Sequence, residues 1–100
     1  MINEISTRSL PLADLIKERR TTLRLTQQEV ADSLQVVPEC VSLWERQKRR
    51  VDLNRVPHLA AILQLDEQDV SRLALFEHYP RLHAALFGAE RPPRPRQLGQ

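Results

Sequence analysis

Residues 25–47 read LTQQEVADSLQVVPECVSLWERQ, and their caps and apolar positions predict two short helices joined by a tight turn. Thr26 is expected to cap the first helix, and Glu29 three residues later completes a capping box. Pro38 disfavours helical backbone at the residue before it and suits the first turn of a new helix. The apolar residues then fall at positions that face inward when the two helices cross steeply. These residues are Val30, Leu34, Val36, Val41 and Trp44, together with the small Ala31.

Helical spacing of apolar residues continues on both sides of this stretch and predicts further helices. Upstream, a helix is expected to begin at Ser9, which has the side chain of a helix cap. Downstream, Asn54 is expected to cap a fourth helix and Asp66 a fifth. Pro80 either kinks the fifth helix or opens a sixth, which Gly88 ends. Because glycine is rare and no strand pattern occurs, the chain is predicted to be all-α, with five to six helices.

The chain of 100 residues is long enough for one small domain with a modest, aliphatic core. Residues 1–8 are expected to be a flexible N-terminus, residues 9–88 the folded domain, and the Arg- and Pro-rich residues 89–100 a disordered tail. The single cysteine excludes an intrachain disulfide and favours a reducing compartment. Because the sequence shows no signal-peptide pattern and no apolar run of membrane-spanning length, we expect a cytoplasmic protein that does not enter a membrane.

Charge is distributed unevenly along the chain, although the formal net charge is only +2. Cations gather at residues 46–55 and again at residues 91–100, whereas acids outnumber cations at residues 66–90. This distribution is compatible with one face that meets a polyanion and another face that points away from it.

Catalytic chemistry is not expected from this sequence. We find no nucleophile–base pair, no carboxylate dyad and no glycine-rich phosphate loop. His58, His78 and His83 have no partners at metal-ligand spacing, so neither a metal nor another cofactor is expected. The chain is therefore predicted not to be an enzyme.

The stretch at residues 25–47 resembles the helix-turn-helix of the lambda-repressor/Cro-like (XRE) family, whose typical pattern is L-T-Q-x-E-L-A-x-x-L-G-V-S-x-x-x-I-S-x-W-E-x-G. The resemblance implies a five-helix bundle over roughly residues 10–75, with the second motif helix entering the DNA major groove. Gln35 and Gln47 stand where the family has glycine. A left-handed backbone at such a residue costs on the order of 1 kcal/mol, which a helical core can absorb. The matching residues are Leu25, Thr26, Gln27, Glu29, Ala31, Leu34, Val36, Ser42, Trp44 and Glu45.

The resemblance also implies which residues support the motif and which meet DNA. The family often pairs an arginine late in the first helix with the glutamate of W-E, which here implies a structural ion pair between Arg20 and Glu45. The exposed face of the second motif helix would read bases, and the residues at those positions are Val37, Pro38, Glu39, Ser42 and Leu43. Phosphate contacts are expected at Thr26, Gln27, Cys40, Arg46, Lys48, Arg49 and Arg50.

Simpler explanations stay open for several of these residues. The predicted readout face is poor in hydrogen-bonding side chains, so we expect DNA shape to supply part of the specificity. Glu39 is equally explained by the favourable interaction of an acid with the first turn of a helix. Cys40 is also compatible with a small, half-buried structural residue, and residues 46–50 with a solvated loop.

Apolar residues continue beyond residue 75, where the five-helix core of the family closes. On one face they would expose more apolar surface than a small monomer usually shows, and a symmetric dimer would cover it. Residues 66–88 are therefore predicted to form a dimer interface. In the alternative, residues 80–88 fold back onto the first helix and complete the core of the same chain. The predicted interface residues are Phe76, Tyr79, Leu82, Leu86 and Phe87.

These features predict a bacterial or phage transcriptional regulator, most simply a repressor, that binds a pseudo-palindromic operator in double-stranded DNA as a homodimer. A second hypothesis is the antitoxin of a toxin–antitoxin pair, which represses its own operon and holds the toxin through residues 66–88 and the tail. A third hypothesis is a helix-turn-helix that binds protein and has lost DNA contact. A toxin or an antirepressor is the protein partner that these alternatives imply.

Overall fold

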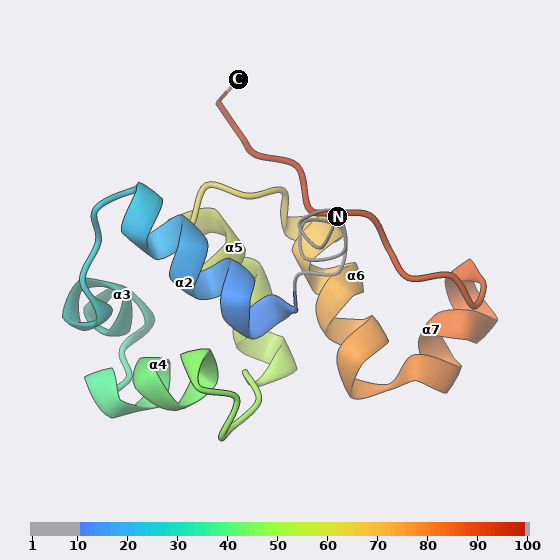
Figure 1. Cartoon of the computed structure of the whole chain (residues 1–100), viewed down its shortest axis with the longest axis horizontal. Helices are drawn as coiled ribbons and strands as arrows, with labels where there is room; N and C mark the ends of the chain where they lie inside the picture. Colours follow the sequence, from blue (N-terminus) through green and yellow to red (C-terminus); the bar gives the residue numbers. More distant parts are fainter. Residues whose placement is uncertain (1–10, 100) are drawn as a thin grey trace, which may run out of the picture.

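The computed structural model describes residues 11–99, in which helices are joined by loops and one isolated bridge pairs Leu65 with Gln97 (Figure 1). The prediction of an all-α chain is confirmed for these residues. The expected flexible N-terminus at residues 1–8 and the cap at Ser9 lie outside the described range. None of the helices within that range is long and apolar enough to cross a membrane. The elements are α2 (Leu12–Thr22), α3 (Gln27–Leu34), α4 (Pro38–Glu45), the 3-10 turn η1 (Leu53–Arg55), α5 (Val56–Ile62), α6 (Glu67–His78) and α7 (Pro80–Phe87).

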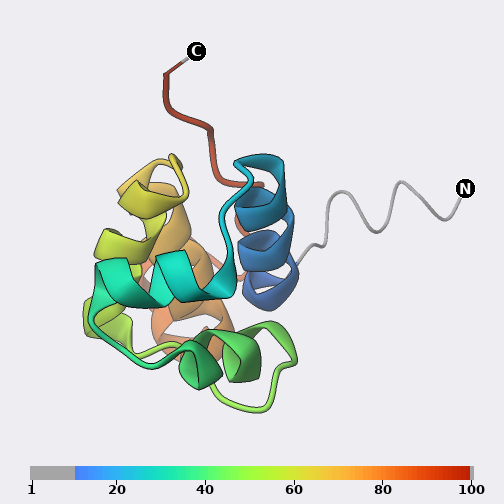
Figure 2. The ribbon, with the colours of Figure 1, turned by 90° about the vertical axis from the view of Figure 1, so that its left-hand side faces the viewer.

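The helices form a bundle with α3 and α4 at one end and α7 at the other (Figure 1). Between these ends α5 packs against α6, α3 packs against α5, and α2 contacts both α4 and α6. Figure 2 shows α3 and α4 side by side, with the loop that follows α4 at one edge of the molecule. The core is aliphatic apart from one tryptophan, as the aromatic-poor composition predicts. Its members include Leu15, Ile16, Val30, Val41, Trp44, Leu59, Leu63, Val70 and Leu73.

Local sequence signals determine where several helices begin. The Thr26 hydroxyl accepts a hydrogen bond from the backbone N–H of Glu29 at 3.0 Å, and the Glu29 carboxylate accepts one from the backbone N–H of Thr26 at 2.8 Å. This is the predicted capping box. Asp66 caps α6 by accepting from the backbone N–H of Asp69 at 3.0 Å. Pro80 opens α7 and does not kink α6, so the second of the two expectations for this residue is confirmed.

The expected cap at Asn54 is wrong. Asp52 provides the local cap by accepting a hydrogen bond from the backbone N–H of Asn54 at 3.4 Å, and residues Leu53–Arg55 form a 3-10 turn. The α-helix starts at Val56, which places Pro57 in its first turn, where no backbone N–H is needed. The short turn thus takes the place of the first turn that was predicted for this helix.

The segment after α7 also differs from the prediction, because it lies against the bundle. The backbone N–H of Asp66 donates to the carbonyl of Arg96 at 2.8 Å, and the backbone N–H of Leu98 donates to the carbonyl of Gln64 at 2.9 Å. Arg94 pairs with Glu18 of α2, and two of the prolines in this segment, Pro92 and Pro95, are buried. The proline rings therefore pack on the bundle, while the arginines meet acids of α2 and α6.

Candidate nucleic-acid interface

The turn between α3 and α4 is fixed by a left-handed residue and by hydrogen bonds to the end of α3. Gln35 has φ 60° and ψ 43°, which is a left-handed backbone. Glycine adopts this conformation most readily, and here a glutamine adopts it. The backbone N–H of Val36 donates to the carbonyl of Ala31 at 3.0 Å. A side chain from outside the unit completes the cap, because Arg55 donates from Nη1 to the carbonyl of Leu34 at 2.9 Å. These contacts hold α3 and α4 at one relative orientation.

The carboxylate of Glu45 ties α4 to both α2 and α3. Arg20 donates from Nε to Oε2 at 2.7 Å and from Nη2 to Oε1 at 3.1 Å, which is the predicted ion pair in bidentate geometry. Gln27, the first residue of α3, donates from its side-chain amide to Oε1 at 3.1 Å. The side chains of Arg20 and Glu45 are only 13% and 4% exposed. Hydrogen bonds to Glu45 raise the pKa of Arg20 above its ordinary value, although burial acts against the increase.

The predicted readout residues share the outward side of α4 and of the turn before it. Val37 is 60% exposed and Glu39 is also exposed, whereas Ser42 and Leu43 are half-buried. Glu39 lies 3.7 Å from Arg46 in an exposed ion pair, and Arg46 also donates from Nε to the Ser42 hydroxyl at 3.2 Å. The spacing of these three residues places them in one polar row along the helix. The remaining readout candidate, Pro38, is half-buried at the first position of α4.

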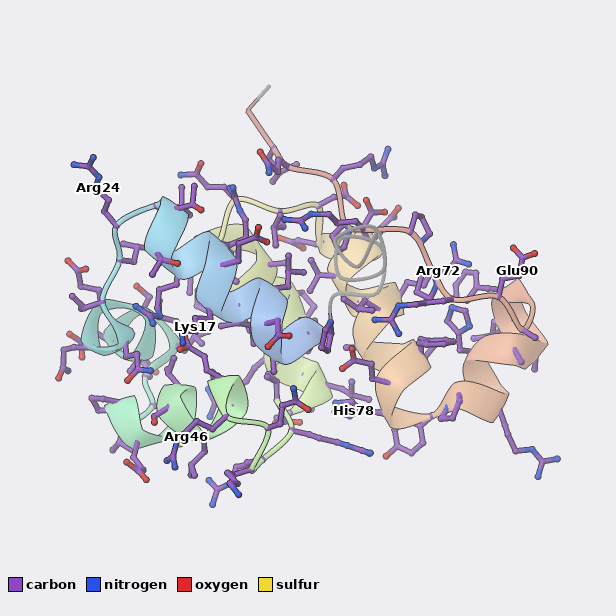
Figure 3. All side chains as sticks on the ribbon, in the orientation of Figure 1. Lys17, Arg24, Arg46, Arg72, His78 and Glu90 are labelled. Atoms are coloured by element: carbon purple, nitrogen blue, oxygen red, sulfur yellow. The ribbon has the colours of Figure 1, made fainter. Side chains whose placement is uncertain are left out.

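Arg46, the last residue of this row, begins a segment with four cations, residues 46–50, which we name the basic loop. Arg46, Lys48, Arg49 and Arg50 are all exposed. The backbone N–H groups of Lys48 and Arg49 donate to the carbonyl of Leu43 at 2.9 and 3.3 Å, so the loop is anchored on the last turn of α4. Gln47 provides the left-handed residue, with φ 60°. The basic loop is therefore a folded segment that continues the exposed side of α4 (Figure 3).

The basic loop also lines a hollow of about 460 Å³ between α2, α4 and α6. His78, at the C-terminal end of α6, also lines this hollow. Burial and the nearby charge of Arg50 lower the pKa of His78, which favours the neutral imidazole. The lining is of mixed charge, because Glu77 lies there together with the cations of the basic loop.

The three predicted phosphate-contact residues outside the basic loop each have a partner within the chain. The Thr26 hydroxyl takes part in the capping box, and the Gln27 amide donates to Glu45. Cys40 is half-buried on α4, and its sulfur lies 3.9 Å from Nη1 of Arg49. The capping box of Thr26 was predicted from the sequence. The contacts of Gln27 and Cys40 were not, because each joins a residue to a partner that only the folded chain brings near.

Most of the predicted dimer residues lie together on α7, far from α3 and α4 (Figure 1). Tyr79, Leu82, Leu86 and Phe87 are each more than half exposed. Phe76 is different, because it is half-buried and packs edge-on against His83 with ring centroids 5.1 Å apart. That residue belongs to the contact between α6 and α7 within one chain. The alternative packing of residues 80–88 on α2 is not the observed one, since α7 packs on α6.

Two side-chain hydrogen bonds within the chain were not expected from the sequence. Arg55 caps α3, and Arg72 donates to a buried histidine, His83, at 3.0 Å. Neither arginine is part of a motif, and no local signal marks its partner. Within residues 11–99 no group of three or more His, Cys, Asp or Glu side chains is arranged to hold a metal ion.

Comparisons of this chain with protein-family models, with curated protein sequences and with solved structures found no match.

Proposed function

We propose that α3, the turn and α4 act as a helix-turn-helix, and that the protein is a DNA-binding transcriptional regulator of the lambda-repressor-like kind. The observation that carries this proposal is the continuity of the exposed side of α4 with the basic loop. An exposed helix followed by four cations offers one element to a groove and one to the adjacent phosphates. The buried network around Glu45 keeps both elements fixed on the bundle.

The two parts of this surface would contribute differently to binding. Arg46, Lys48, Arg49 and Arg50 would neutralise phosphates, which gives affinity without reading sequence. Val37 and Leu43 offer apolar contacts to thymine methyl groups, and Glu39 offers an acceptor to the amino group of cytosine. Because Glu39 is paired with Arg46 in the free protein, reading cytosine requires that exposed ion pair to open. An exposed pair contributes little free energy, so the rearrangement costs little.

The experiment that tests the proposal is the salt dependence of binding to duplex DNA. We expect the logarithm of the binding constant to fall linearly with the logarithm of salt concentration. Replacing Arg49 by alanine should weaken binding to all sequences alike and lower the slope by about one unit. Lys17→Ala is the matched control, since Lys17 is an exposed cation on α2 and outside the basic loop.

Two results would count against the proposal. One is an Arg49→Ala slope equal to that of the wild type, which would remove the basic loop from the interface. The other is the absence of any salt-dependent affinity for DNA in a folded protein. That outcome would favour the protein-binding alternative, which the exposed apolar side of α7 supports independently.

A further inference from the structure

The inner side of α7 is anchored on α6 by aromatic rings that surround the buried His83. His83 is fully buried, and its Nε2 accepts a hydrogen bond from Nε of Arg72 at 3.0 Å. The imidazole ring also contacts Phe76 and Phe87, each with ring centroids 5.1 Å apart, and the Arg72 guanidinium lies 4.7 Å from the centre of the Phe87 ring. These contacts fix the rotation of α7 about its own axis. The outward side of the helix is consequently well defined.

That outward side is an apolar stripe with a small residue in its middle. Tyr79, Leu82 and Leu86 follow one another at spacings of three and four residues, and Ala85 lies between the two leucines on the same side. Leu82 is 51% and Leu86 is 62% exposed. Of the six large hydrophobic residues exposed in the described chain, three belong to this stripe, while the partly exposed Phe87 packs on the inner side. A small residue flanked by leucines allows a second helix to approach closely and interdigitate.

The charges next to the stripe are arranged against the preference of a single helix. Arg81 is in the first turn of α7 and Glu90 follows its last turn, whereas the helix dipole favours the opposite order. Both side chains are exposed, and neither forms an ion pair with any residue in the range 11–99. Glu90 projects from the end of the molecule where α7 lies (Figure 3). An antiparallel second helix would reverse this situation by bringing each charge to the favourable end of the other helix.

We propose that the outward side of α7 binds a second copy of this chain, with the two α7 helices antiparallel across a two-fold axis. In a two-fold interface every contact occurs twice, so Arg81 of each copy approaches Glu90 of the other. The leucines cover each other in the middle, and Ala85 provides the space for them. This charge complementarity distinguishes a second copy from an unrelated apolar partner, which would leave both charges without a counter-ion.

This inference specifies the pairing that the proposed function assumes. Because α7 and the pair α3 and α4 lie at opposite ends of the molecule, a second copy bound on α7 leaves both helix-turn-helix surfaces uncovered (Figure 1). A two-fold pair would then present two such surfaces to two half-sites. The self-association does not require DNA, so it is tested without DNA and can fail independently of the DNA-binding proposal.

The test is a charge-reversal series measured by analytical ultracentrifugation at low salt. We expect the wild type to have twice the chain mass of 11.6 kDa at tens of micromolar concentration. Arg81→Glu and Glu90→Arg, made singly, should each raise the dimer dissociation constant by about tenfold or more, because like charges then face each other. The double variant Arg81→Glu/Glu90→Arg should restore most of the wild-type affinity. Both positions are exposed, and circular dichroism would verify that each variant keeps its helices.

The alternatives give different results. A wild type that stays monomeric overturns the interface, and a dimer that neither single substitution weakens moves the interface away from α7. Dimers weakened by the single substitutions but not restored in the double variant overturn the antiparallel orientation, since a parallel pair would place position 81 against position 81. A change of Leu86 to Asp gives a second measure of the interface, because it removes apolar contact without altering the buried side of α7.

Discussion

The carboxylate of Glu45 is the single group on which α2, α3 and α4 converge. It accepts three hydrogen bonds from Arg20 and Gln27, and it is almost completely buried. A buried carboxylate is costly unless donors surround it, and removing a donor or the acceptor leaves the remaining charge without a partner. The network therefore orients the proposed DNA-binding unit on the bundle. Its position at the end of α4 explains how the basic loop that begins at the next residue is held in place.

We predict that Glu45→Gln lowers the free energy of unfolding by about 2–3 kcal/mol, because the Arg20 guanidinium loses its counter-ion in a mostly buried position. Urea unfolding measures this change. Glu39→Gln is the matched control, since Glu39 belongs to an exposed ion pair and its replacement should alter stability little. Equal effects of the two substitutions would show that the network around Glu45 does not stabilise the fold.

At the scale of elements, the segment after α7 acts as an extended strap over α6. Arg96 donates from Nε to Asp69 at 2.8 Å and from its backbone N–H to the same carboxylate at 2.9 Å. The hydrogen bond from the Arg96 side chain is the main reason why the pKa of Asp69 lies below its ordinary value. Asp69 also belongs to the first turn of α6, where an acid is favourable. The strap therefore depends on an ionised carboxylate.

We predict that this contact weakens in acid. A carboxyl group with a lowered pKa in the folded state stabilises that state above its ordinary pKa, and this contribution is lost as pH falls through the lowered value. Backbone amide signals of Arg96 and Leu98, followed by NMR in an acid titration, should therefore move together at a pH below the ordinary pKa of an aspartic acid. Asp69→Asn should abolish the transition, whereas Glu67→Gln, at the neighbouring exposed acid, should retain it. Unchanged signals in the wild type would contradict the strap's dependence on Asp69.

The elements that the sequence predicted correctly depend on neighbours within a few positions along the chain. The capping box at Thr26 and the helix start at Pro38 are of this kind. The left-handed backbone at Gln35 was expected from the family pattern, which has glycine there. The pair of Arg20 with Glu45 was accessible only through a family resemblance, because nothing local joins residues so far apart. The ordered packing of residues 89–99 was not predicted, because a segment rich in proline and arginine has no periodicity of its own and was expected to be disordered. Its order comes from acids that lie many residues earlier in the chain.

At the scale of the whole molecule, two surfaces with different chemistry lie at opposite ends of one bundle (Figure 1). The end formed by α3 and α4 carries the basic loop, and the other end carries the apolar side of α7. The first surface has the charge that would attract phosphates, whereas the second is mainly apolar. The proposed division of labour is therefore one end for DNA and the other for a second copy.

The central claim is that the side of α4 next to the basic loop reads DNA. The most direct test is the selection of bound sequences from a random pool of duplex DNA. We predict enrichment of sequences with two inverted half-sites, whose centres lie one or more helical turns apart, at about 10–10.5 base pairs per turn. A variant with Val37→Ala and Glu39→Ala should change the enriched half-site while the basic loop preserves general affinity. A pool that stays random after repeated rounds with folded wild-type protein would contradict the claim.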